Sequence, residues 1–295
     1  MREKIKMLIQ KLRGQTPADP IQSRIDYYLA HGRLPWSHGY LDYRNQVISK
    51  SLADQALMDK FVQGVLPDGF GQGLDERLVE YLWVFSKLSA QSGRLLDAGA
   101  TFNYDFVLSA PLIASFELCI QTFFPEEQHF PERRISYQFG DLRHLIFKDG
   151  AFDTVVCQST LEHIDMDMSV YGYQLPRASS PGQASYSFME SLAECERVLK
   201  PGGLLLITVP YGQWEDHGFF QQFDQAMVEH MDGYLRPKGS VHLDYFQYVN
   251  QGWKWSKESD CRTSRSYNPH TGEGKGADGA AHSRAVACLS FHKDT

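Results

Sequence analysis

Short apolar runs separated by polar, helix-like stretches dominate the chain from residue 93 onward. Such runs are typical of strands buried on both faces, and their alternation with helical stretches predicts an α/β protein with a mostly parallel sheet. Two apolar runs near the C-terminus flank a polar, glycine-rich stretch and predict an antiparallel pair that closes the sheet. The seven predicted strands lie in RLLDAG, SFELCIQTF, RISYQFGD, FDTVVCQS, GLLLITVP, VHLDYFQYVNQGWKW and SRAVACLSFHK.

The first 90 residues show helical rather than strand periodicity. The clearest apolar stripe at helical spacing consists of Leu78, Leu82, Phe85 and Leu88. It follows the turn-forming stretch LPDGFGQG, and Asp75 is a suitable residue to cap the N-terminus of this helix. We therefore expect an N-terminal helical cap over residues 1–90 and the main domain over residues 91–295.

The composition of the chain limits the kinds of molecule that it is expected to bind. The 295 residues carry a formal net charge of −7, which gives a nucleic-acid backbone no general electrostatic attraction, so a small-molecule partner is favoured. The five cysteines never form a CxxC pair and fall mostly in apolar runs, as expected for reduced core residues of a cytoplasmic protein. No segment is apolar for the roughly 18 residues that a membrane-spanning helix needs. Residues 1–14 could form a basic amphipathic helix on an anionic membrane, but an ordinary terminal helix is the preferred interpretation.

Chemistry-bearing residues follow several of the predicted strands. They occur in the stretches LLDAGATFNYD, QFGDLRHLIF and CQSTLEHI. Ligands of open parallel sheets bind at the carboxyl ends of the strands. With LKPGG before the fifth strand, these motifs make residues 93–210 resemble the class I S-adenosylmethionine-dependent methyltransferases, and a wider set of motifs resembles a bacterial methyltransferase-like subgroup.

The resemblance implies a Rossmann-like seven-stranded sheet with an antiparallel last strand, helices on both faces, and S-adenosylmethionine as the cofactor. In this family the first loop lies under the methionine part of the cofactor, and an Asp with the next backbone N–H holds the adenine edge. Carried over residue by residue, the implied cofactor-binding residues are Asp97, Gly99, Ala100, Asn103, Thr122, Asp141, Leu142, Gln158 and Ser159.

Two positions depart from the family pattern. The first loop has only one glycine, Gly99, although Ala100 is small enough to let a ligand approach. Asn103 could donate to the cofactor's carboxylate or could serve only as a turn former. The acid expected at the end of the second strand, where it would accept from both ribose hydroxyls, is replaced by Gln121 or Thr122. Glu126 could reach back, but a solvated surface acid is the preferred interpretation.

Two histidines are candidates for the chemistry. His217 is our first choice for a general base, because a neutral imidazole suits proton abstraction near pH 7. His163 is the second candidate, with a role in shaping the pocket preferred. Loops at this end of the sheet hold the methyl acceptor in the family, which implies Tyr211, Trp214 and Phe219 as substrate-binding residues.

These motifs predict a methyltransferase acting on a small molecule, such as a sugar, a surface-glycan precursor or a secondary metabolite. No metal is expected, because the acids after the fourth and fifth predicted strands, namely Asp165, Asp167, Glu215 and Asp216, have no diagnostic spacing. A nicotinamide oxidoreductase would need GxGxxG after the first strand, which GATFNYD does not provide. A non-catalytic binding or scaffold protein that keeps the sheet is the main alternative.

Overall fold

The computed structural model describes most of the chain, namely residues 19–88, 90–126, 128–172, 175, 177–250 and 252–295. The helices are α2 (Pro20–Ala30), α3 (Tyr40–Ala53), α4 (Gln55–Val62), α5 (Arg77–Leu88), α6 (Asp105–Leu108), α7 (Phe188–Val198), α8 (Gln225–Leu235) and α9 (Glu258–Cys261). The strands are β1 (Gly93–Ala98), β2 (Phe116–Thr122), β3 (Ser136–Phe139), β4 (Phe152–Gln158), β5 (Leu199–Pro210), β6 (Glu215–Asp216), β7 (Gln221–Gln222), β8 (Gly239–Val249), β9 (Gly252–Ser256) and β10 (Ala285–Lys293).

The main sheet has eight strands in the order β3-β2-β1-β4-β5-β10-β8-β9. Strands β1 to β5 pair in parallel, whereas β10 lies antiparallel between β5 and β8. The predicted α/β sheet with an antiparallel last strand is therefore confirmed. The predicted count of seven is wrong by one, because the segment taken as a single strand turns at Asn250 (φ 48°) and returns as the edge strand β9.

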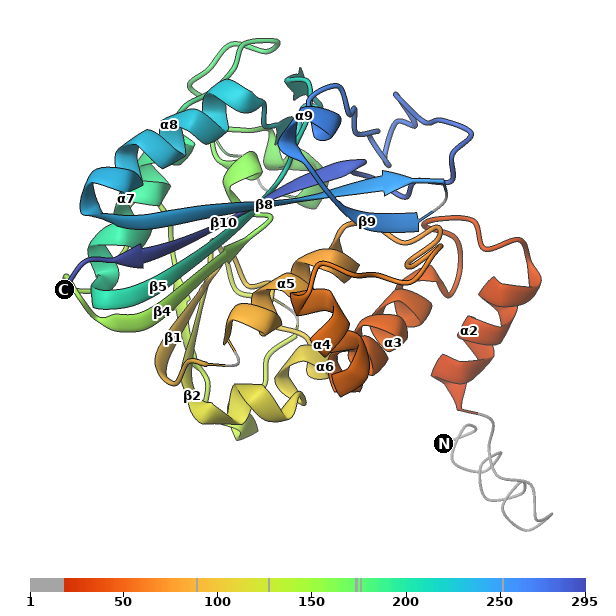
Figure 1. Cartoon of the computed structure of the whole chain (residues 1–295), viewed down its shortest axis with the longest axis horizontal. Helices are drawn as coiled ribbons and strands as arrows, with labels where there is room; N and C mark the ends of the chain where they lie inside the picture. The colour runs from red at the N-terminus through yellow and green to blue at the C-terminus, as the bar shows by residue number, and fades with distance from the viewer. Residues whose placement is uncertain (1–18, 89, 127, 173–174, 176, 251) are drawn as a thin grey trace.

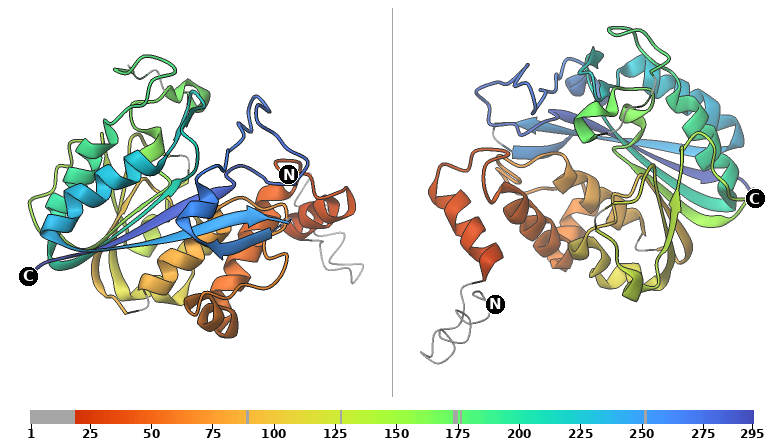
Figure 2. Two further views of the ribbon diagram at one scale, coloured as in Figure 1. Left: turned by 45° about the horizontal axis from the view of Figure 1, so that its top comes forward. Right: turned by 180° about the vertical axis from the view of Figure 1, so that it is seen from behind.

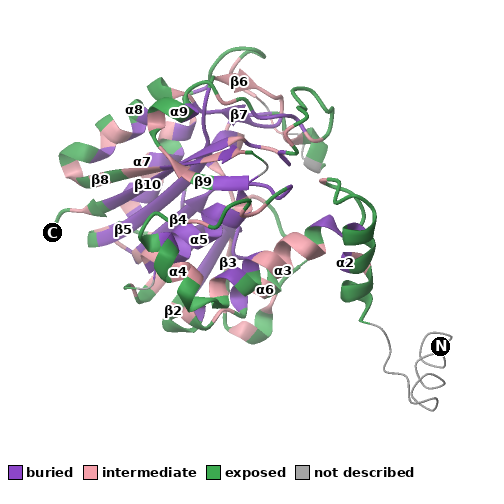
Figure 3. Ribbon diagram, turned by 45° about the vertical axis from the view of Figure 1, so that its right-hand side comes forward, coloured by how far each residue is buried: buried purple, intermediate pink, exposed green. Residues whose placement is uncertain are grey.

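Helices cover both faces of this sheet, as Figures 1 and 2 show. On one face α3, α4 and α5 share a core with strand residues such as Leu95 and Val286. On the other face α7 and α8 share a second core with residues such as Leu96 and Ala287. Neighbouring residues of one strand thus enter opposite cores, which is why these strands are apolar nearly throughout (Figure 3).

Helix α5 ties the N-terminal segment to the sheet. Its predicted apolar stripe is buried, but Val79, Trp83 and Val84 are buried as well, so the helix is enclosed on nearly all sides. The carboxylate of Asp75 accepts from Arg44 at 2.7 Å, so its side chain pairs with a neighbouring helix. The boundary between a cap over residues 1–90 and a domain over residues 91–295 stays a prediction, and the predicted terminal helix over residues 1–14 lies outside the described residues.

All five cysteines are buried and none forms a disulfide. Burial raises the pKa of Cys119 and of Cys261 to about 11, so both thiols are protonated at neutral pH. Among the described residues, no helix is long and apolar enough to cross a membrane.

Candidate active site

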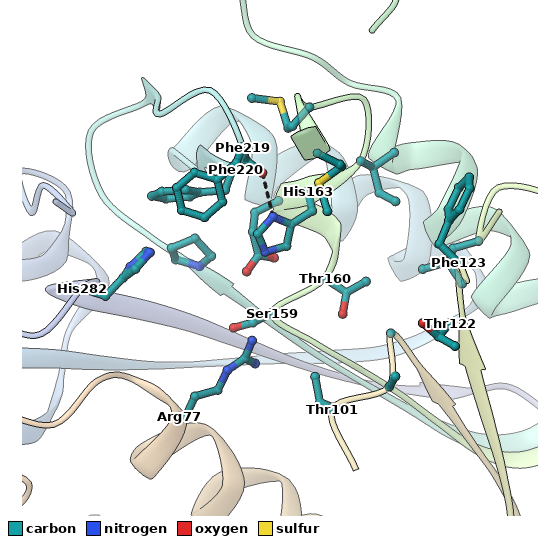
Figure 4. A pocket seen from close by; sticks show the side chains of 18 of the residues that line it. Arg77, Thr101, Thr122, Phe123, Ser159, Thr160, His163, Phe219, Phe220 and His282 are labelled. Atoms are coloured by element: carbon teal, nitrogen blue, oxygen red, sulfur yellow. Dashed lines mark hydrogen bonds between the residues drawn. The ribbon is translucent and has the colours of Figure 1, made fainter. Parts of the chain in front are cut away.

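A cavity of about 960 Å³ opens at the carboxyl ends of the central strands. The strand register brings these ends together, since Ala98 pairs with Gln121 and Gln158 with Thr208. Figure 4 shows Thr122, Ser159 and His163 around this hollow. The predicted site residues that line it are Gly99, Ala100, Thr122, Asp141, Leu142, Ser159, His163 and Phe219.

Asp97 lies beneath the cavity and holds the first loop from below. Its carboxylate accepts from the backbone N–H of Phe102 at 2.7 Å and from the N–H and hydroxyl of Thr101 at 3.2 and 3.1 Å. Burial raises the pKa of Asp97 to about 7, although these hydrogen bonds favour the ionised form. The Phe102 side chain is buried in the core beside Phe85, so it does not fill the cavity.

The turn after Asp97 brings its backbone against the cavity. Gly99 has φ 127°, and a Cβ placed on it would come within 2.0 Å of Thr160 Oγ1. Ala100 also adopts a left-handed conformation, with φ 60°. The carbonyl of Thr101 accepts from the Tyr81 hydroxyl of α5. One glycine therefore suffices at the tightest point, and α5 and Asp97 hold the rest of the turn.

Asn103 and Thr122 both form hydrogen bonds with the carboxylate of Glu126. The Asn103 amide donates to Glu126 at 2.7 Å, and the Thr122 hydroxyl lies 3.3 Å from the other oxygen of Glu126. Tyr137 donates to the Asn103 carbonyl at 2.9 Å and fixes the amide's orientation. Glu126 is exposed, as the interpretation of a surface acid expects, and it also lines the cavity. Asn103 lies behind it and does not line the cavity.

The turn after β3 contributes Asp141 and Leu142. Arg143 donates to the Asp141 carboxylate through Nη2 at 2.7 Å and through its backbone N–H at 2.9 Å. Partial burial opposes ionisation, but these bonds hold the pKa of Asp141 below its usual value. The Gln121 amide donates to the carbonyl of Gly140 at 2.6 Å, which joins this turn to the end of β2.

The end of β4 is bonded to helix α5. Ser159 and Thr208 both donate to the buried carboxylate of Glu80, and Arg77 donates to the other oxygen of Glu80 at 3.3 Å. Gln158 is completely buried and is not among the residues that line the cavity. The guanidinium of Arg77 reaches toward Ser159 at the edge of the hollow in Figure 4.

The structure separates the two predicted histidines. His163 lines the cavity, and its Nδ1 lies 2.8 Å from the carbonyl of Phe219, which requires a proton on Nδ1. Burial lowers the pKa of His163 to about 4, so the ring is neutral at pH 7. His217 stacks on Phe220 with ring centroids 4.4 Å apart and lies 3.5 Å from Glu215. It is outside the cavity wall, so our first choice of base is not brought to the cavity.

Two of the three predicted substrate residues also lie elsewhere. Tyr211 is fully buried, and its hydroxyl donates to Glu258 at 2.5 Å. Trp214 lines a separate surface depression, with its indole N–H 3.4 Å from Gln221. Only Phe219 lines the main cavity. The chain turns directly after β5, so that Tyr211 and Trp214 do not reach the main cavity.

Several lining residues come from segments to which the sequence assigned no site. Trp36 has φ 65°, and its indole donates to the carbonyl of Ala281 at 2.7 Å, joining the N-terminal segment to the chain before β10. We call the following set the helix-side wall: Trp36, Arg44, Asp75, Glu76, Arg77, Glu162, His163, Phe219, Phe220 and His282. A usable signal was the group of charges at the start of an otherwise apolar helix, in LDERLVEYL.

The acids considered as metal ligands have protein partners instead. Asp165 accepts from the N–H of Ala178 and Ser179 and from Ser185, and Asp216 pairs with Arg177 at 2.9 Å. Asp167 caps Ser169, and Glu215 pairs with Arg265. Within the part of the chain that the structure describes, no three His, Cys, Asp or Glu side chains form a group that could hold a metal ion.

One family model matches part of the chain. Residues 120–207 match the family model described as a methyltransferase domain. This segment runs from β2 through β5 and includes Asp141, Ser159 and His163. The match covers less than a third of the 295 residues, so this segment is similar to a methyltransferase domain, and the strand order shows a Rossmann-like sheet. The search of curated proteins found no match.

Solved structures resemble the chain at low identity. A 1,6-didemethyltoxoflavin-N1-methyltransferase from Burkholderia thailandensis, solved with S-adenosylhomocysteine, is 12% identical, with a TM-score of 0.44 and coverage of 87% of this chain and 89% of that one. The N-methyltransferase NodS from Bradyrhizobium japonicum WM9 is 14% identical, with a TM-score of 0.41 and coverage of 85% and 99%. The [4+2]-cyclase SpnF is 15% identical, with a TM-score of 0.46 and coverage of 85% and 97%.

Proposed function

We propose that this protein transfers a methyl group from S-adenosylmethionine to a small molecule bound in the same cavity. The observation that carries the proposal is the convergence of the first loop, the Asp141 turn and the end of β4 on one hollow. Its volume of about 960 Å³ is at the upper end of the range for ligand pockets, which leaves room for an acceptor beside the cofactor.

The lining residues offer suitable groups for each part of the cofactor. The main chain of Gly99 and Ala100 can approach the methionine part, and the N–H of Leu142 with the carboxylate of Asp141 can bind an adenine edge. We assign the ribose hydroxyls to Glu126, because Asn103 and Thr122 already orient its carboxylate toward the end of β2. This assignment replaces the acid that is missing from β2 itself.

The cofactor supplies an electrophilic methyl group on a sulfonium. The protein's task is to hold the acceptor atom in line with that group and to exclude water. Phe219 and Phe220 provide an apolar surface on the helix-side wall. Trp36 lines the same wall and is bonded to Ala281, in the chain before β10. His163 is the imidazole nearest this task, but with a pKa of about 4 it is a weak base and serves mainly to position Phe219.

The sequence predicts only the chemical class of the methyl acceptor. A sugar, a surface-glycan precursor or a secondary metabolite remains the prediction. The alternative of a non-catalytic binding or scaffold protein is decided by the same experiment that tests cofactor binding.

Isothermal titration with S-adenosylhomocysteine tests the proposal. We expect micromolar binding, and Asp141→Ala should weaken it by about tenfold, or about 1.4 kcal/mol, through loss of the adenine contact. Asp149→Ala is the matched control, because Asp149 is an exposed partner of Arg197 outside the cavity. Absence of heat and of a thermal shift at about 1 mM ligand would refute the enzyme and favour the scaffold.

A further inference from the structure

The charged side chains of the helix-side wall do not pair completely. Arg44 is bonded to Asp75 at 2.7 Å, and Arg77 is bonded to Glu80 at 3.3 Å. Each pair uses one guanidinium nitrogen, Nη1, and the positive charge of Arg77 also acts on Glu76 and Glu162. Two further carboxyl groups line the same wall, those of Glu76 and Glu162.

Within the part of the chain that the structure describes, neither Glu76 nor Glu162 forms an ion pair with a lysine or an arginine. Glu76 accepts from the N–H of Ser283 at 3.1 Å, and its other oxygen lies 3.7 Å from His282. Glu162 is only 4% exposed, and its buried Oε2 has no hydrogen-bond partner among the described residues. A buried carboxyl oxygen without a donor is unfavourable by several kcal/mol, so such a group signals a missing partner.

The neighbouring histidines do not supply the missing positive charge. Burial lowers the pKa of both His163 and His282 to about 4, so both rings are neutral at pH 7. Burial also raises the pKa of Glu76 to about 7, although Arg77 acts in the opposite direction. The wall therefore offers excess carboxyl groups in an enclosed, partly aromatic site.

Resting on the proposed function, we propose that the methyl acceptor carries a basic amine, bound as an ammonium group by Glu76 and Glu162 with its apolar part against Phe219 and Phe220. An ammonium donates three hydrogen bonds, and its positive charge favours the ionised form of these two carboxyl groups, whose pKa burial raises. The carboxyl groups are already desolvated by the fold, so binding a cation relieves an existing penalty. A hydroxyl group would donate only one hydrogen bond and leave the charge unbalanced.

A matched series of probes that differ only in the head group tests this assignment. Protein saturated with S-adenosylhomocysteine is titrated calorimetrically with 2-phenylethylamine, 2-phenylethanol and phenylacetate. We expect the amine to bind about tenfold more tightly than the alcohol, and the carboxylate not to bind. Equal or tighter binding of the alcohol would point to a hydroxylated acceptor and overturn the proposal, as would tighter binding of phenylacetate or no binding of the amine at roughly 10 mM.

Substitution of the two carboxyl groups locates the preference. In the double variant Glu76→Gln/Glu162→Gln we expect the amine to lose its advantage over the alcohol, to within about twofold, while affinity for S-adenosylhomocysteine is retained. Retained cofactor affinity shows that the variant is folded. Glu229→Gln, at an exposed site on α8, is the control and should keep the full preference. An undiminished preference in the double variant would overturn the assignment to these residues.

The two proposals fail separately. If S-adenosylhomocysteine does not bind but the free protein still prefers the amine, the methyltransferase proposal is wrong and the amine site stands. If the cofactor binds and the amine has no advantage, only the acceptor assignment is wrong.

Discussion

The hydroxyl of Thr208 donates to the buried carboxylate of Glu80 across 2.8 Å, which fastens helix α5 to the end of β5. Ser159 donates to the same oxygen from the end of β4. The other oxygen of Glu80 accepts from Arg77 on the cavity wall. One carboxylate thus fixes the distance between the N-terminal helices and the strand ends that form the cavity.

Glu80→Gln should therefore destabilise the fold. The amide presents donor hydrogens where Arg77 also donates, so the guanidinium loses its carboxylate. We expect the free energy of unfolding in urea to fall by about 2 kcal/mol, below the range for a fully buried pair because Arg77 is partly exposed. Glu229→Gln on α8 should leave the unfolding curve unchanged, and an equal effect of both substitutions would contradict this role of Glu80.

Gly99→Ala tests whether the single glycine of the first loop is indispensable. The added Cβ would lie 2.0 Å from Thr160 Oγ1 at φ 127°, so either the turn or Thr160 must move. We expect a loss of about 3 kcal/mol in unfolding free energy and weakened binding of S-adenosylhomocysteine. Gly64 also has a positive φ, 78°, but a Cβ there would meet open space. Gly64→Ala therefore measures the loss of stability from backbone strain without the contact to a neighbouring side chain. If the two variants lose the same stability, the close approach to Thr160 is unimportant.

Glu126→Gln tests the assignment of the ribose site. The amide keeps the size of the side chain but accepts hydrogen bonds through only one oxygen. We expect affinity for S-adenosylhomocysteine to fall by about tenfold in calorimetry, with the melting temperature of the free protein unchanged because the residue is exposed. Glu132→Gln, another exposed acid before β3, should retain wild-type affinity. Unchanged affinity in Glu126→Gln would remove this residue from the cofactor site.

His282→Gln should change the dependence of stability on pH. Burial lowers the pKa of His282 from 6.5 to about 4, so between these values the unfolded chain binds a proton that the native ring does not. His282 therefore reduces native stability as the pH falls from about 6.5 to 4, by up to about 3 kcal/mol. Relative to wild type, the variant should become more stable on acidification, measured by urea unfolding at a series of pH values. In the control His230→Gln, on the exposed surface of α8, stability should depend on pH as it does in wild type. The same pH dependence in His282→Gln as in wild type would contradict the lowered pKa of His282.

Local patterns were enough for the sheet and for one part of the site. Apolar runs marked β1, β2, β4 and β5 because most of their residues are buried, whereas the edge strand β3 has only exposed and half-buried residues. Asp97, Gly99 and Asp141 were recognisable since each lies at or just beyond the end of a strand, and parallel strands bring their carboxyl ends together. The hairpin of β8 and β9 was missed because its turn, near Asn250, interrupts an otherwise continuous aromatic pattern.

Apart from His163 and Phe219, the residues of the helix-side wall could not be found in this way. Trp36 and His282 are 246 residues apart and meet only through tertiary packing at Ala281. Glu126 lies four residues after β2. Its position beside the cavity depends on a tertiary hydrogen bond from the Asn103 amide, which the local sequence pattern does not reveal. His217 and Trp214 were chosen for residue type in a promising loop, but the turn after β5 directs them elsewhere.

The two walls of the cavity come from different stretches of chain. The first loop, Glu126 and Asp141 lie between residues 97 and 142, whereas Trp36, Arg44 and Glu76 lie before residue 90. Substitutions in the early segment can therefore alter which molecule is accepted without disturbing the turn that Asp97 secures. Under the proposed function, the choice of acceptor and the binding of the methyl donor can therefore change separately during evolution.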